Sequence, residues 1–326
     1  MGNKPWTVAV LLGGVSAERP VSIKSGHAVS AALKKAGLDV IEVDVKGDIE
    51  KLLDDTQSRC DAAFIALHGT FGEDGGIQRM LEARAIPYTG SGPEASKAAM
   101  DKQISKALFS EAEVPTPAGI VLSEPFEPEA AKDLARTMGF PVVVKPVAQG
   151  SSKGVHIVRT EAEILPAMAD AASFDDRVIV ESFLPNAEFA VGILDDEPLP
   201  VIEIRYPCDT FDYEAKYISN ETEYILDPPV GGELEREMQR IAVKAHNILG
   251  CKHFSRVDLR LDAENGPCVL EVNTIPGLTS HSLLPKAAAA AGISFVDLCK
   301  RMLASTSART DSMSMHRAVA PSTGGR

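Results

Sequence analysis

Cysteine is scarce in this chain. Its five cysteines, Cys60, Cys208, Cys251, Cys268 and Cys299, are odd in number, and no two of them form a Cys-x-x-Cys pair. Zinc ribbons and disulfide frameworks both need paired cysteines, so the sequence excludes both. Unpaired thiols are typical of a reducing compartment, and we therefore expect a cytoplasmic protein.

Long apolar runs are also missing. The longest, such as Val8–Leu12 and Ala287–Ala291, are short, whereas a membrane span needs about 20 apolar residues. The first of them comes without the charged region and cleavage site of a signal peptide. We therefore expect no secretion signal and no membrane partner.

The chain has no surplus of positive charge and few aromatic residues. Its 33 Lys and Arg stand against 46 Asp and Glu, a net charge of −13, and aromatic residues make up 5%. Nucleic-acid binding needs a basic surface, and single strands also need aromatic rings for stacking. We therefore expect no nucleic-acid partner. A hydrophobic content of 44% predicts folded cores, and 326 residues are enough for two or three domains.

Strand-like and helix-like segments alternate from the N-terminus. Residues 7–12, 38–43 and 62–67 have the apolar pattern of buried strands, and residues 22–36 have helical spacing. This alternation predicts an α/β fold, with a doubly wound parallel sheet whose ligand site lies at the strand C-termini. This N-terminal domain is expected to span residues 1–93.

The rest of the chain predicts two further α+β units and a tail. The central unit should span residues 94–185 and the C-terminal unit residues 186–305, while residues 306–326 have no periodicity and predict a disordered tail. The expected elements are helices 94–112, 161–171, 233–249 and 295–304, strands 141–145, 155–159 and 178–182, an irregular stretch 207–229 and a hairpin 254–273.

The predicted hairpin is the most informative segment. A four-residue turn that pairs Asp262 with Pro267 places Asp258 directly opposite Glu271. Two carboxylates about 5 Å apart repel each other by roughly 3 kcal/mol at an effective dielectric constant near 20. A cation between them is therefore expected.

The same register supplies a third oxygen ligand. It places Arg256 opposite Asn273, and Asn273 shares a face of its strand with Glu271. Two carboxylates and an amide oxygen suit Mg²⁺ that also holds phosphate oxygens. Asp258, Glu271 and Asn273 are thus candidate metal ligands, and the alternative is a solvated polar face of the hairpin.

A phosphate site must be built without the common loops. The sequence has no Gly-x-x-x-x-Gly-Lys-Ser/Thr loop and no clean Gly-x-Gly-x-x-Gly. Lys145 ends an apolar strand, and a loop of small residues, 149–154, follows it; its backbone N–H groups can approach phosphate oxygens. Lys97 is a second candidate. The alternative for both lysines is a solvated side chain.

Two glycine-rich segments follow strands of the first domain. Residues 13–19 follow the first strand, where backbone amides and a helix N-terminus can receive an anion. His68 and residues 69–75 follow the third strand. A histidine at this ligand-binding edge is a candidate for catalysis, and the alternative is a structural histidine.

Ordered motifs extend over nearly the whole chain, from Leu11 to about Leu303. They are Gly13-Gly14-x-Ser16-x-Glu18; His68-Gly69 with Gly72-Glu73-Asp74-Gly75; Tyr88-Thr89-Gly90-Ser91-Gly92; Lys145-Pro146 with Gly150-Ser151-Ser152-x-Gly154; Asp212-Tyr213-Glu214-Ala215-Lys216-Tyr217; Arg256-Val257-Asp258; Glu271-Val272-Asn273-Thr274 with Pro276-Gly277; and Thr279-Ser280-His281-Ser282-Leu283. In these motifs the chain resembles the D-alanine–D-alanine ligase family of the ATP-grasp superfamily. The resemblance implies an ATP-grasp fold and the ATP-dependent ligation of two D-alanines through an acyl phosphate. The implied products are D-alanyl-D-alanine, a peptidoglycan precursor, with ADP and phosphate.

The resemblance also implies where ATP and metal bind. ATP would lie between the central and C-terminal units, with two Mg²⁺ ions, or Mn²⁺ in their place, on Asp258, Glu271 and Asn273. The implied nucleotide contacts are Lys97, Lys145, Gly150, Ser151 and Ser152 for the phosphates, Glu181 and Leu184 for adenine, and Glu188 for ribose.

Two D-alanine sites are implied in the same way. Glu18 would bind the amino group of the first D-alanine. Lys216, Ser282 and the backbone N–H of Leu283 would hold the carboxylate of the second.

The resemblance further implies the catalytic groups. Arg256 and the N–H of Gly277 would stabilise the oxyanion, and His68 would help to remove a proton from the attacking amine. A hydrogen-bond chain from Glu18 through Ser151 to Tyr217 would latch residues 207–229 as a lid that excludes water.

The sequence departs from the usual family pattern in places. The departures are Arg79, Gln149, Lys153, Ser182, His253 and Arg260. None falls on an implied metal ligand or D-alanine contact, so we expect them to change affinity rather than abolish activity.

Two other functions are left open. A non-catalytic nucleotide-binding module would have lost the metal ligands, and all three are present. A ligase for another acid and amine would differ at Glu18, Lys216 or Ser282, and none differs. Tyr217 favours an amine over D-lactate as the second substrate. The family is usually dimeric, so we expect a homodimer.

Overall fold

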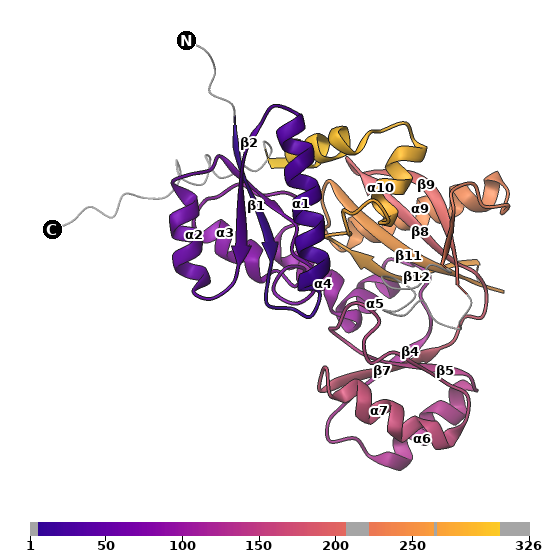
Figure 1. Ribbon diagram of the computed structural model, residues 1–326. Helices are drawn as coiled ribbons and strands as arrows, with labels where there is room; N and C mark the ends of the chain where they lie inside the picture. The colour runs from indigo at the N-terminus through magenta and orange to yellow at the C-terminus, as the bar shows by residue number, and fades with distance from the viewer. Residues whose placement is uncertain (1–5, 207–221, 264–265, 307–326) are drawn as a thin grey trace, which may run out of the picture.

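The computed structural model describes residues 6–206, 222–263 and 266–306. Within these ranges the strands form three sheets, each covered by helices (Figure 1). The described chain confirms the predicted mixture of a parallel N-terminal sheet with further α+β units.

The N-terminal sheet is parallel and has the strand order β2-β1-β3. Val8 and Val10 of β1 pack on the side of α1, whereas Ala9 and Leu11 pack on the side of α2 and α3. Both faces are therefore buried, which explains the unbroken apolar run of β1 and confirms the doubly wound arrangement. The elements are β1 (Thr7–Gly13), α1 (Arg19–Lys35), β2 (Asp39–Val45), α2 (Ile49–Gln57), β3 (Ala62–Ile65) and α3 (Gly76–Ala83).

The central sheet is antiparallel and has the order β4-β7-β5-β6, with α6 and α7 packed on one face. Its three predicted strands are confirmed. The edge strand β4 and helix α6 were not predicted; β4 is short and largely exposed, so it lacks a strong apolar pattern. The elements are β4 (Gly119–Ser123), α6 (Pro128–Met138), β5 (Val142–Pro146), β6 (His156–Val158), η1 (Glu161–Glu163), α7 (Ile164–Ala172) and β7 (Arg177–Ser182).

The C-terminal sheet is antiparallel and has the order β10-β9-β8-β11-β12. Helix α9 covers one face, while α10 and the helical residues 295–306 cover the other. The elements are β8 (Glu188–Leu194), β9 (Glu197–Arg205), β10 (Glu223–Ile225), α9 (Gly232–Ile248), β11 (Phe254–Asp262), β12 (Gly266–Asn273) and α10 (Leu283–Ala290). Strand β10 lies within the stretch predicted to be irregular, and the rest of the predicted tail after Thr306 lies outside the described residues.

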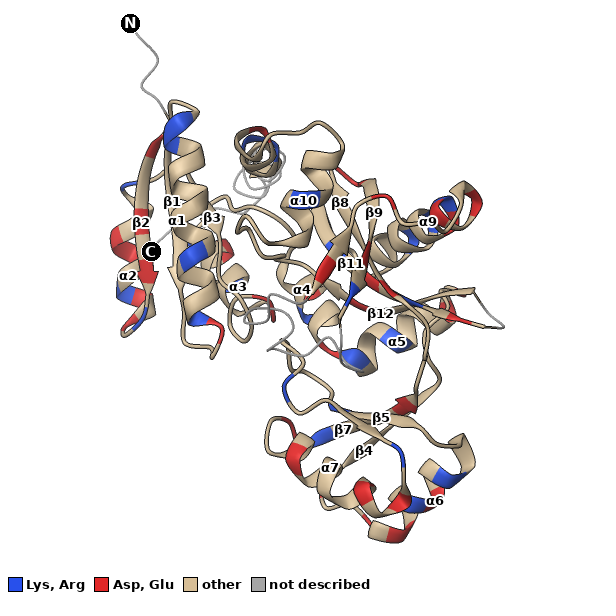
Figure 2. Ribbon diagram, turned by 45° about the vertical axis from the view of Figure 1, so that its right-hand side comes forward, with Lys and Arg blue, Asp and Glu red and all other residues tan. Residues whose placement is uncertain are grey.

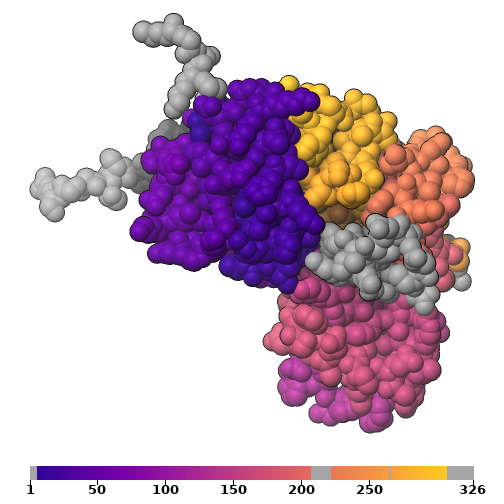
Figure 3. All heavy atoms as spheres, in the orientation of Figure 1, coloured from indigo at the N-terminus to yellow at the C-terminus, as the bar shows by residue number. Residues whose placement is uncertain are grey.

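One hydrophobic core joins the first domain to the C-terminal unit. Val29 and Leu33 of α1 share a buried cluster with Leu284 of α10 and Leu298. Figure 3 shows the first domain and the last segment of the described chain packed directly against each other. The central sheet and its helices, by contrast, project away from this shared core (Figures 1 and 3).

The single helix predicted over residues 94–112 is wrong, because the structure breaks it into α4 (Pro93–Met100) and α5 (Lys102–Glu111). At the break Asp101 has an extended backbone, with ψ 104°, and its side chain accepts the N–H groups of Gln103 and Ile104. An aspartate that caps the next helix ends the previous one at little cost. The break turns the chain toward the central sheet at Lys102.

Candidate active site

Strands β11 and β12 bring the predicted carboxylates together. Asp258 is the cross-strand partner of Glu271, and Arg256 is the partner of Asn273, as predicted. The predicted register is wrong near the turn, where Asp262 pairs with Gly266. A β-bulge between Asp258 and Leu259 restores the predicted register at the site. Bulges of this kind re-aim side chains near functional sites.

Asp258 already faces a cation within the protein. The Arg256 guanidinium donates from Nε and Nη2 to its two carboxylate oxygens, each at 2.7 Å, and Asn273 donates from Nδ2 at 3.1 Å. The carboxylate is buried, at 5% exposure. Arg256 therefore supplies from the protein itself part of the positive charge that was expected near Asp258 and Glu271.

The donor set nevertheless fits a hard cation. In residues 6–206, 222–263 and 266–306 no three His, Cys, Asp or Glu side chains lie close enough to hold a metal by themselves. Asp258 and Glu271 supply carboxylate oxygens, and rotation of the Asn273 amide would turn its oxygen toward them. An incomplete set of oxygen ligands suits Mg²⁺, which usually takes further ligands from phosphate and water.

Two cavities meet at this hairpin. The larger, of about 1640 Å³, lies between the first domain and the C-terminal unit, and the smaller, of about 110 Å³, lies between the central and C-terminal sheets. Glu271, Lys102 and Gln149 line both. The larger cavity is lined by the predicted residues Glu18, His68, Gly150, Ser151, Arg256, Asn273, Gly277, Ser282 and Leu283. The smaller is lined by the predicted residues Lys145, Ser152, Glu181, Leu184, Glu188 and Asp258.

The structure does not bring Lys97 to either cavity. Lys97 is on the exposed side of α4, whereas Lys102, at the start of α5, is buried at 6% exposure and lines both cavities. The Lys102 Nζ donates to the carbonyl oxygen of Gln149 at 2.9 Å. Sequence reasoning missed Lys102 because it assumed one continuous helix; the Asp101 cap just before it was the available signal.

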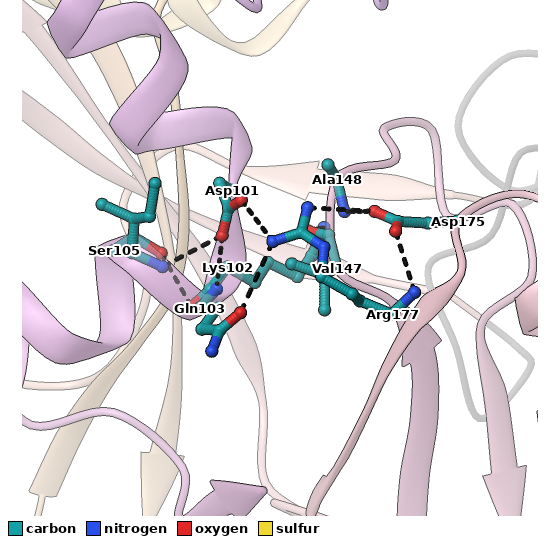
Figure 4. Close-up of polar contacts among 9 residues, drawn as sticks. Asp101, Lys102, Gln103, Ser105, Val147, Ala148, Asp175 and Arg177 are labelled. Carbon is teal, nitrogen blue, oxygen red and sulfur yellow. Dashed lines mark hydrogen bonds and ion pairs between the residues drawn. The ribbon is translucent and has the colours of Figure 1, made fainter. Parts of the chain in front are cut away.

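A polar network holds Lys102 and the loop that follows β5 in place (Figure 4). Arg177 donates to Asp101 at 2.8 Å and lies 3.5 Å from Asp175, which accepts the N–H of Ala148 at 2.8 Å. The backbone N–H of Lys102 donates to the carbonyl oxygen of Val147 at 3.1 Å. The network thus ties the start of α5 to the loop that follows β5.

Basic and acidic residues are mixed along α2, α6 and α9 (Figure 2), whereas Lys145 and Glu181, which line the smaller cavity, are buried at 7% and 2% exposure. Glu181 forms ion pairs with Lys145 and, at 2.9 Å, with Lys106. Burial alone would raise the pKa of Glu181, but the two lysines hold it below its ordinary value. Glu181 is therefore an ionised acceptor inside the pocket.

The loop after β5 reaches across to the first domain. Ser151 and Ser152 have positive φ values of 55° and 54°, a conformation that costs energy in residues other than glycine and is often kept at functional sites. The Ser151 hydroxyl donates to the Glu18 carboxylate. The first link of the implied latch is thus present; Tyr217 and Lys216 lie outside the described residues.

His68 is a buried, neutral imidazole in the wall of the larger cavity. Its Nδ1 lies 3.1 Å from the carbonyl oxygen of Ile275, so Nδ1 carries the proton. Its Nε2 lies 3.1 Å from the Ser25 hydroxyl, whose oxygen accepts the N–H of Leu278. Burial lowers the pKa of His68 to about 4. The ring connects α1 to the loop after β12, and its role as a base stays a prediction.

Glu73 also lines the larger cavity, although it was not predicted as a site residue. Its carboxylate accepts the N–H of Gly69 at 2.7 Å, and burial together with the charge of Glu18 raises its pKa well above the ordinary value. Its place in the Gly72-Glu73-Asp74-Gly75 motif was the available signal.

The remaining predicted residues meet at the start of α10. Ser282 is the N-cap residue, and its hydroxyl lies 2.9 Å from that of Thr279. A Cβ at Gly277 would lie 2.7 Å from the Ser282 hydroxyl oxygen, so a side chain there would displace this hydroxyl. The first N–H of α10, from Leu283, belongs to a helix N-terminus that favours a carboxylate.

Two antiparallel sheets that enclose a small pocket lined by charged residues, beside a hairpin with facing carboxylates, define an ATP-grasp enzyme. Family models named D-ala D-ala ligase N-terminus and C-terminus match residues 48–91 and 108–304. A D-alanine–D-alanine ligase of Hydrogenovibrio crunogenus is 44% identical over 301 residues, 92% of this chain and 94% of that protein. The chain belongs to the D-alanine–D-alanine ligase family and is an ADP-forming ligase.

Solved structures agree with this assignment. A D-alanine–D-alanine ligase of Bacillus anthracis complexed with ATP has a TM-score of 0.83 and 31% identity, over 94% of this chain and 99% of that one. The VanG D-Ala:D-Ser ligase of Enterococcus faecalis has a TM-score of 0.81 and 30% identity, over 93% and 100% of the two chains. In the described ranges of this chain, no helix combines the length and apolarity that a membrane span requires.

Proposed function

We propose that this chain joins two molecules of D-alanine in the cytoplasm at the expense of ATP, for peptidoglycan precursor synthesis. The γ-phosphoryl group of ATP passes to the carboxylate of the first D-alanine and leaves ADP. The neutral amine of the second D-alanine attacks the acyl phosphate, so that the peptide bond forms, phosphate leaves and the amine gives up a proton. The observation that carries this proposal is that Glu271 and Lys102 line both cavities. A phosphate group at the end of the smaller cavity would thereby meet a carboxylate in the larger one.

The nucleotide is proposed to lie in the smaller cavity. Lys102, in place of the predicted Lys97, joins Lys145 and the loop residues Gly150, Ser151 and Ser152 on the phosphates. Glu181 and the backbone of Leu184 bind adenine, and Glu188 binds ribose.

Asp258, Glu271 and Asn273 would hold two Mg²⁺ ions, for which Mn²⁺ can substitute. Such ions, when bound, neutralise charge on the phosphates. Arg256, which now holds Asp258, is placed to exchange this contact for one with the developing oxyanion.

The D-alanines are proposed to bind in the larger cavity. Glu18 receives the first ammonium group, and its contact with Ser151 connects it to the phosphate loop. Ser282, the N–H of Leu283 and Lys216 hold the second carboxylate, and the N–H of Gly277 joins Arg256 at the oxyanion. The neutral ring of His68 fits a site that must receive a neutral amine. We further propose a homodimer, on the family resemblance alone.

Phosphate release tests the proposal. The purified protein with ATP and Mg²⁺ should release phosphate when D-alanine is added and should not respond to L-alanine. Removal of Mg²⁺ with a chelator should stop the release, and its return should restore it. Equal turnover with both enantiomers would contradict the substrate assignment.

A further inference from the structure

We propose that Arg260 is a nucleotide-binding residue of this ligase: it places a fixed positive charge at the base and ribose end of the smaller cavity. The proposal deepens the proposed function, since it assigns a new contact to the same ATP. Arg260 lies on β11 and lines the cavity together with Leu184 and Glu188. Its side chain is 13% exposed.

Contacts to three neighbours hold the guanidinium rigidly. Nη1 donates to the carbonyl oxygen of Leu184 at 2.7 Å, Nε donates to Glu188 at 3.3 Å, and Nη2 donates to the Tyr206 hydroxyl. The group also lies 5.6 Å from the centre of the Phe183 ring. Every nitrogen is thus committed to a protein acceptor, and what Arg260 offers to a ligand is its charge and its flat face. A planar guanidinium of this kind stacks on aromatic rings, including nucleobases.

The charge balance of the cavity supports this role. Four carboxylates line it, those of Glu181, Glu188, Asp258 and Glu271. ATP brings further negative charge, so the lining needs cations. Lys102 and Lys145 also line the cavity, and Lys145 is paired with Glu181. Arg260 is the cation beside Leu184 and Glu188.

Arg260 also positions Glu188. The Glu188 carboxylate accepts from Arg260 and, at 2.8 Å, from the Tyr206 hydroxyl. Burial beside the negative charge of Glu188 raises the pKa of Tyr206, so this hydroxyl keeps its proton as a donor. Two donors that fix one carboxylate prepare it to accept ribose hydroxyl groups.

The test compares Arg260→Met and Arg260→Lys with wild type. ATP and adenosine affinities are measured by displacement of a fluorescent ATP analogue without D-alanine, and KM and kcat are measured by phosphate release. Arg260→Met should weaken both ATP and adenosine about tenfold, the size of a partly desolvated cation–π or charged contact. Arg260→Lys should recover part of the loss, and the KM for D-alanine should stay unchanged.

The controls separate a binding role from a structural one. Arg205→Met removes an exposed arginine at the end of β9 that pairs with Glu203 on the same strand, and it should leave both affinities unchanged. Lys145→Met should weaken ATP much more than adenosine, because Lys145 is assigned to the phosphates. Unchanged or tighter adenosine binding by Arg260→Met would overturn the inference. A wild-type protein that binds ATP and makes no dipeptide would instead refute the proposed function.

Discussion

Arg256 holds Asp258 through both oxygens of its carboxylate, with Nε and Nη2 each at 2.7 Å. Both side chains come from β11, two residues apart, and so share a face of the sheet. The carboxylate assigned to metal and the guanidinium assigned to the oxyanion are therefore one unit. We expect a bound metal ion and Arg256 to compete for Asp258. Binding of the metal with ATP would then release Arg256 from Asp258 to contact the oxyanion.

The metal assignment predicts that Glu271→Gln loses most of its activity and keeps its fold. The amide is a poorer ligand for a divalent cation, and Glu271 lines both cavities. Phosphate release should fall by at least about 10²-fold, and the thermal unfolding midpoint should stay near that of wild type. Glu197→Gln, at the exposed start of β9, is the matched control. Unchanged phosphate release by Glu271→Gln would remove the metal argument.

Lys102 and Lys97 distinguish the phosphate contact inferred from the structure from the one predicted from the sequence. Lys102→Met should raise the KM for ATP by roughly 10- to 100-fold, because it removes a buried charge from the proposed phosphate site. Lys97→Met should leave it unchanged, since Lys97 is exposed and reaches neither cavity. The KM for ATP of the two variants is measured by steady-state kinetics. A larger increase for Lys97→Met than for Lys102→Met would show that Lys97 is the phosphate ligand.

The network of Figure 4 predicts that Arg177 affects ATP binding without contacting the nucleotide. Arg177→Met leaves Asp101 and Asp175 without their shared cation, so the loop that starts at Val147 should be less ordered. We expect a several-fold higher KM for ATP with a smaller change in the KM for D-alanine. Arg136→Met, which breaks exposed pairs with Asp133 and Glu161, is the control. Equal effects of both variants would show that Arg177 matters for stability only.

The buried ring of His68 predicts a loss of stability in acid. Its pKa is lowered by burial from 6.5 to about 4. Between these values the unfolded chain binds a proton that the folded chain does not. The free energy of unfolding therefore decreases as the pH is lowered. The full loss from this group is about 3 kcal/mol. Urea unfolding at neutral pH and near pH 4.5 should show a smaller loss for His68→Gln than for wild type, and equal losses would contradict the low pKa.

Much of the fold could be predicted from residue patterns alone. The alternation that begins with β1 gave the parallel domain, because a strand buried on both faces is apolar throughout. The facing pair Asp258 and Glu271 followed from pairing arithmetic in a hairpin. That arithmetic erred by one residue at the turn and was right at the site only because a bulge compensates.

Other features depend on contacts between distant segments. The helix break at Asp101 is fixed partly by Arg177, 76 residues away. The pairing of Asp258 with Arg256 depends on side-chain conformations that no spacing rule gives. The short edge strand β4 owes its pairing to β7, and its own sequence carries little apolar signal.

Mass spectrometry of the product tests the central claim most directly. Wild-type protein is given ATP, Mg²⁺ and a panel of D- and L-amino acids and D-hydroxy acids, singly and in pairs. The account predicts D-alanyl-D-alanine from D-alanine alone, with one ADP and one phosphate for each dipeptide. ATP cleavage without dipeptide, or a product that lacks D-alanine, would contradict it.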